Sequence, residues 1–89
     1  MYLHIGRDTV IPASSVVGIY DLDTTTFSKH TRALISGMEK SGRVVRLYHI
    51  LNDIPKSAIL CVEGGEALLY MTQLSSSALL RRSKLLLGE

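Results

Sequence analysis

Two apolar runs joined by a Gly-Gly pair dominate the pattern of the chain. Residues 57–62 and residues 67–72 are almost continuously apolar, and Glu63-Gly64-Gly65-Glu66 separates them. Two short apolar runs around a Gly-Gly pair predict a β-hairpin. Neither run alternates apolar with polar residues, so we expect both faces of this hairpin to be covered.

Short runs rich in β-branched and aromatic residues predict four more strands, at residues 2–5, 9–11, 16–21 and 44–49. Gly6-Arg7-Asp8 is the expected turn between the first two, and Pro12 should end their ladder because it has no N–H to donate. Residues 51–56 form a loop into the central hairpin, in which Pro55 restrains Ile54 to extended geometry.

From residue 26 the period becomes that of an amphipathic helix. Its apolar face carries Phe27, Leu34, Ile35 and Met38, and its polar face carries Lys29, Arg32, Ser36 and Lys40. Thr25, Thr26 or Ser28 can cap its start, and Gly42 is the expected left-handed stop.

A second helix is predicted after Ser75-Ser76-Ser77, a run of potential N-caps. Its apolar side carries Leu79, Leu80, Leu86 and Leu87, and its basic side carries Arg81, Arg82 and Lys84.

These elements predict one small α+β domain spanning residues 1–89, with a twisted, mostly antiparallel sheet of five or six strands and two helices. The chain has 89 residues, of which 46% are hydrophobic, a high apolar content for a domain with a thin core. Two short helices can cover about one face of such a sheet. We therefore expect the second face to be an assembly surface, most simply for copies of the same chain.

The residue types argue against several classes of protein. No apolar run approaches the roughly 18 to 20 residues of a membrane span, and no signal peptide opens the chain, so we expect a soluble protein with no membrane partner. The single Cys61 lies in an apolar strand, which fits a buried thiol in a reducing compartment. We expect no metal and no other cofactor, because His4, His30 and His49 lack partners at ligand spacing. Nor does the chain carry a nucleophilic triad or a phosphate-binding glycine loop, so we do not expect an enzyme.

The basic residues form two candidate surfaces for nucleic acid in a chain of net charge +2. The first comprises Lys29, Arg32 and Lys40 with Arg43 and Lys56, for which a solvated helix face is the alternative interpretation. The second comprises Arg81, Arg82 and Lys84, which also suit the C-terminal dipole of the second helix. No aromatic residues interleave with these charges, which favours contacts to a duplex backbone over single strands.

Four motifs occur in order along the chain: Tyr2-Leu3-His4-Ile5-Gly6, Val10-Ile11-Pro12, Ile54-Pro55-Lys56-Ser57, and Leu74-Ser75-Ser76-Ser77-Ala78-Leu79 with its trailing Arg81-Arg82. Together they resemble the RemB-type extracellular-matrix regulators of the small bacterial RemA/RemB family. The resemblance implies a LytTR-like fold, ring-like homo-oligomers, and a cytoplasmic transcriptional regulator of matrix (biofilm) genes.

Where the RemA-like branch is associated with DNA-contacting arginines, this chain reads Pro12-Ala13-Ser14-Ser15 and Asn52-Asp53-Ile54-Pro55-Lys56, and only Lys56 is positively charged. The leading hypothesis is a homo-oligomeric regulator that binds duplex DNA through lysine and arginine. The alternative is an oligomeric interaction module that has lost direct DNA binding and acts through a related regulator.

Overall fold

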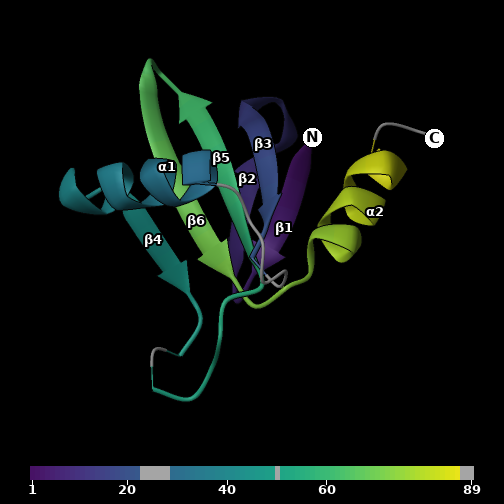
Figure 1. The fold of residues 1–89 in the computed structure, drawn as a ribbon. Coiled ribbons are helices and arrows are strands. Elements are labelled where there is room, and N and C mark those ends of the chain that lie inside the picture. Colours follow the sequence, from purple (N-terminus) through teal and green to yellow (C-terminus); the bar gives the residue numbers. More distant parts are fainter. Residues whose placement is uncertain (23–28, 50, 87–89) are drawn as a thin grey trace.

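Six strands and two helices make up the computed structural model, which describes residues 1–22, 29–49 and 51–86 (Figure 1). The small sheet pairs β1 (Tyr2–Gly6) with β2 (Thr9–Pro12). The large sheet has the order β3-β5-β6-β4, built from β3 (Val16–Asp21), β4 (Val44–Leu47), β5 (Ser57–Glu63) and β6 (Glu66–Thr72). The helices are α1 (Lys29–Lys40) and α2 (Ser76–Leu86), and a 3₁₀ turn, η1 (Ala13–Ser15), joins β2 to β3. The predicted α+β class is confirmed, with its strands divided between two sheets.

The central hairpin is formed as predicted. β5 and β6 pair antiparallel from Ser57 opposite Thr72 to Glu63 opposite Glu66. Gly64 and Gly65 between them have φ angles of 60° and 79°, the pair of positive values that a type I′ hairpin turn requires. The Gly-Gly pair therefore fixes the register of β5 and β6.

The predicted N-terminal hairpin also forms, but it packs on the large sheet instead of joining its ladder. At the contact, Gly6 has φ 141°, and a Cβ built on it would lie 2.6 Å from Thr72 Oγ1. Thr72 is itself 1% exposed, and its hydroxyl oxygen accepts a hydrogen bond from the N–H of Leu74 at 3.2 Å. Glycine is therefore the residue that lets the hairpin approach the sheet this closely.

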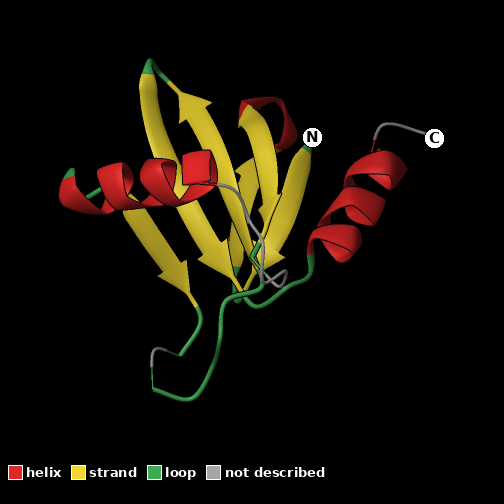
Figure 2. Cartoon of the chain, in the orientation of Figure 1, coloured by secondary structure: helices red, strands yellow, loops and turns green. Residues whose placement is uncertain are grey.

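The two helices cover opposite faces of the large sheet, contrary to the expectation that they share one. On the first face, Leu3, Ile5 and Ile11 of the hairpin join Leu79 of α2 over Leu47, Ile59 and Cys61. α1 crosses the second face (Figure 2), and its half-buried Ile35 and Met38 pack there against Ala58, Leu69 and Met71. The prediction was wrong because it counted the N-terminal hairpin as part of the sheet, whereas the hairpin serves as a cover.

Both described helix ends agree with the sequence. Gly42 has φ 70°, its N–H donates to Glu39 O at 3.1 Å, and the N–H of Arg43 donates to Met38 O at 2.9 Å. These two bonds form a Schellman motif that ends α1. The N–H of Ala78 donates to Ser75 Oγ at 3.2 Å, so Ser75 is the N-cap of α2. The candidate caps Thr25, Thr26 and Ser28, together with Phe27 and Leu87, lie outside the described residues.

β4 ends at Leu47, two residues earlier than predicted, because the chain turns at His49. The N–H groups of Asn52 and Asp53 donate to His49 O at 3.1 and 2.8 Å, and the N–H of His49 donates to Asp53 Oδ2 at 2.9 Å. The 51–56 loop (residues 51–56) then projects from the end of the sheet at which β5 begins (Figure 1). Over the described ranges, no helix is long and apolar enough to cross a membrane.

Candidate functional site

One exposed face of α1 carries a row of cations. Lys29, Arg32 and Lys40, here called the α1 stripe, are all exposed, while Leu34, Ile35 and Met38 on the other side are half-buried. At 1.5 Å per residue, the stripe extends over about 16 Å of helix. The helix packs on β4 and β6 through its apolar side, so the stripe faces away from the sheet. The structure thus brings these three predicted residues together.

Arg43 and Arg46 serve different neighbours beside the stripe. Arg46 Nη2 lies 2.5 Å from Glu39 Oε2, so Glu39, which lies next to the stripe on α1, forms an ion pair with Arg46. Arg43 is half-buried, its Nη1 donates to Ala67 O at 3.3 Å, and its own carbonyl accepts from Leu69 N at 2.9 Å. Arg43 therefore ties the end of α1 to β6, and its predicted contact with DNA stays a prediction.

The α2 cations lie near the opposite edge of the large sheet. α2 packs on β1 and β3, and β3 and β4 are the two edge strands. Arg81 is exposed, whereas Arg82 is half-buried and donates from Nη1 to His4 O at 3.0 Å, with His4 Nδ1 at 3.1 Å. Arg82 thus holds α2 against β1. Lys84 lies in the last turns of α2. The two predicted basic surfaces are therefore separate and do not form a continuous patch.

Lys56 occupies a third position, where the 51–56 loop enters β5. Its backbone N–H donates to Thr72 O at 2.8 Å, its carbonyl accepts from Leu22 N at 2.8 Å, and its side chain is exposed. The same loop exposes 87% of Leu51 and 79% of Ile54. Sequence reasoning treated these two aliphatic residues only as parts of a loop, although aliphatic residues in a predicted loop, one of them directly before Pro55, were a usable signal.

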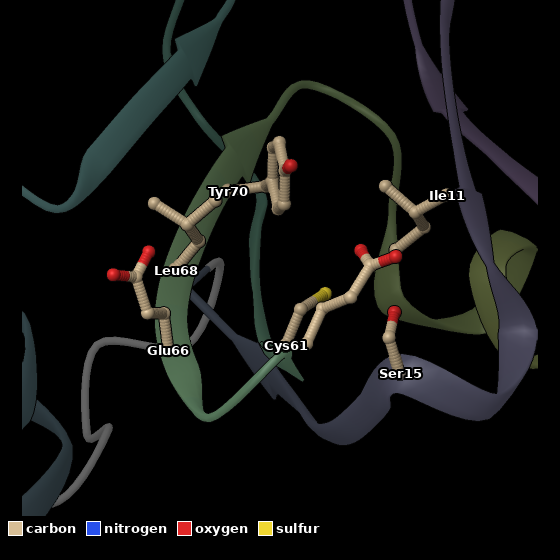
Figure 3. Close-up of a pocket in the computed structure, with 7 residues that line it drawn as sticks. Ile11, Ser15, Cys61, Glu66, Leu68 and Tyr70 are labelled. Atoms are coloured by element: carbon tan, nitrogen blue, oxygen red, sulfur yellow. The ribbon is translucent and has the colours of Figure 1, made fainter.

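A hollow of about 220 Å³ lies beside the turn end of the central hairpin (Figure 3). This hollow was not predicted from the sequence. Its lining comprises Ile11, Ser15, Cys61, Glu63, Glu66, Leu68 and Tyr70. Glu63 and Glu66 stand directly opposite each other at the end of the ladder, and both are exposed. Two like charges in this relation repel each other, so a cation at this end of the hairpin would be favourable.

Two ionisable groups that line the hollow, those of Cys61 and Tyr70, have raised pKa values. Burial raises the pKa of the Cys61 thiol, hydrogen bonding to Ser15 lowers it, and the charge of Glu63 raises it, with a net rise. Burial also raises the pKa of Tyr70, followed by the charges of Cys61 and Glu63. The hollow is therefore an apolar recess with acidic groups on its rim. No group of three or more potential metal ligands occurs among the described residues.

Comparison with known proteins identifies a relative of similar length. The chain is 29% identical over 84 residues to extracellular matrix regulatory protein B of Bacillus subtilis (strain 168), an alignment that covers 94% of this chain and 91% of that protein. No family model matches the chain. The alignment supports a RemB-like relationship and confirms the resemblance seen in the sequence motifs, while the LytTR-like fold stays a prediction.

Proposed function

We propose that this RemB-like chain regulates extracellular-matrix genes as a homo-oligomer that binds the backbone of duplex DNA through lysine and arginine. The name of its relative supports the regulatory role. The observation that carries DNA contact is the α1 stripe, three exposed cations on one helix face directed away from the core. Such a face suits phosphate oxygens, which lie along the grooves that a helix can enter.

The charges of one copy give only weak binding. If the three cations of the stripe neutralise three phosphates, log K falls with log salt at a slope of about −2.7, which is about a 40-fold loss between roughly 50 and 200 mM salt. A homo-oligomer repeats the stripe, and engaging a second copy multiplies the affinity without new kinds of contact. Assembly is therefore part of the proposed function, because it makes a modest charge per chain effective.

The test compares two charge reversals of equal size, Lys29→Glu on the stripe and Arg7→Glu in the exposed turn between β1 and β2. A glutamate at the N-terminus of α1 interacts favourably with the helix dipole, so Lys29→Glu should not weaken the helix. Binding of a fluorescent duplex is followed by anisotropy at roughly 50 and 200 mM salt. We expect Lys29→Glu to lower the affinity more than tenfold and to flatten the salt slope, and Arg7→Glu to act far less.

Two results would contradict the proposal: no binding of the wild-type chain at the lower salt concentration, or equal effects of the two reversals. Arg81→Glu in the same assay tests the α2 surface. A loss with Arg81→Glu alone would move the DNA contact from α1 to α2.

A second candidate function is an interaction module without direct DNA binding. The observation that favours it is that Arg43 and Arg82 hold the fold together, while Leu51 and Ile54 are exposed to a partner. In that case the wild-type chain should not bind duplex at low salt but should co-elute with a purified RemA-type regulator. Leu51→Asp should then abolish co-elution, and Lys29→Glu should not.

A further inference from the structure

We infer that the 51–56 loop of one copy docks in the hollow of the next, so that copies join head to tail. This inference rests on the homo-oligomer of the proposed function and names the two surfaces that meet. The chain itself covers both faces of the large sheet, so this docking would bury apolar side chains that remain exposed elsewhere.

The loop has the features of a docking element. Among the described residues, Leu51 and Ile54 are the two most exposed large hydrophobic side chains, at 87% and 79%. The loop that carries them is fixed at both ends, by the bonds between His49 and Asp53 and by the backbone bonds of Lys56 to Thr72 and Leu22. Docking a loop already held in one shape loses less conformational entropy than ordering a free segment.

The hollow matches an aliphatic side chain in size and chemistry. Ile11, Cys61, Leu68 and Tyr70 give it an apolar lining, and Leu68 is still 36% exposed there. Its volume of about 220 Å³ exceeds the ~150 Å³ of apolar cavities known to hold a benzene molecule. One leucine or isoleucine side chain from another copy therefore fits the space.

The charges around the two surfaces are complementary. Ile54 and Lys56 are two positions apart in the same loop, and both side chains are exposed. Ile54 in the hollow would therefore bring Lys56 to the rim, where Glu63 and Glu66 repel each other. A docked Lys56 would give these two glutamates a counter-charge.

The loop cannot fill the hollow of its own chain. It enters β5 at Ser57, whereas the rim of the hollow lies at Glu63, the other end of the same strand. A seven-residue strand is about 20 Å long, and the loop projects away from that strand (Figure 1). The loop and the hollow are different surfaces, and contacts between unlike surfaces produce closed rings or open filaments.

The experiment uses two variants that each lose one of the surfaces. Leu51→Asp/Ile54→Asp removes the apolar loop, and Leu68→Arg fills the hollow and repels Lys56; both changes are at exposed positions. Light scattering after gel filtration should show wild-type oligomers and a monomer for each variant alone. An equimolar mixture of the two variants should form a 1:1 dimer and stop, because one intact loop meets one intact hollow. Val17→Asp, at a 63% exposed position on β3, should assemble like the wild type.

Several outcomes would overturn the inference. These are a wild-type chain that stays monomeric, a loop variant that assembles normally, and a mixture of variants that stays monomeric. Circular dichroism confirms that each variant is folded. The duplex assay separates this inference from the proposed function: oligomers that fail to bind DNA leave the docking intact and remove the DNA contact, whereas a monomer that binds DNA does the reverse.

Discussion

The close approach of Gly6 to Thr72 allows a prediction with a magnitude. In Gly6→Ala, the new methyl group would lie 2.6 Å from a buried hydroxyl, and the backbone would keep a φ of 141° that side chains rarely adopt. Backbone strain of this kind costs about 1–3 kcal/mol, and overpacking a core costs about 1–3 kcal/mol. We therefore expect Gly6→Ala to lower the free energy of unfolding by about 2–6 kcal/mol, a large part of the stability of a small domain.

Urea denaturation followed by circular dichroism measures this loss. Gly37→Ala is the matched control, because nothing lies within 4 Å of a Cβ built at that helical position. We expect the control to raise stability by up to about 1 kcal/mol. Thr72→Ala removes the clashing oxygen and leaves the nearest Thr72 and Leu47 carbons at 3.6 Å, so it should be less harmful in the Gly6→Ala background than in the wild type. A Gly6→Ala variant within about 0.5 kcal/mol of the wild type, or independent effects of the two changes, would refute the reasoning.

Four further predictions concern Leu79, Cys61 and Arg82. Leu79→Ala should lower the free energy of unfolding by about 2–5 kcal/mol in urea, because this 0% exposed side chain fixes α2 to the core. Cys61 should react with iodoacetamide far more slowly in the native than in the urea-unfolded chain, since burial keeps the thiol protonated, and comparable rates would contradict this. The pKa of Cys61 is higher in the folded than in the unfolded chain, so its contribution to stability is complete below the unfolded thiol pKa and is lost as the pH rises through the folded pKa. Urea midpoints measured across the alkaline range should therefore fall less in Cys61→Ala than in the wild type. Arg82→Ala should cost about 0.5–1.5 kcal/mol and speed amide exchange in β1, and unchanged exchange would show that its bonds to His4 do not secure α2.

The strands and turns could be predicted from sequence because they depend on neighbouring residues. The Gly64-Gly65 turn and the helical period of apolar and polar residues in α1 are local signals, and the structure contains both the turn and the helix. The placement of the N-terminal hairpin behind the sheet could not be predicted, because residues 2–12 look the same whether they pair with the other strands or cover them. Packing between distant segments decides that choice.

The candidate site divides in the same way. Helical periodicity alone groups Lys29, Arg32 and Lys40 on one face, and the structure shows all three exposed. The role of Arg82 could not be predicted, because its acceptor, His4, lies 78 positions away along the chain. The hollow is also lined by residues from β2, η1, β5 and β6, so no single sequence motif predicts it.

The hydrogen bonds between Arg82 and His4 connect the first strand to the last helix, and Leu3 shares a buried cluster with Leu79. During translation, the chain therefore cannot complete its hydrophobic core until α2 has been synthesised. Until then part of the apolar surface of Leu3 and Ile5 stays exposed, and the first strand can associate with other proteins through it. Cells making this protein should thus be most sensitive to its misfolding late in translation, and shortening it within α2 should yield insoluble material instead of a smaller working unit.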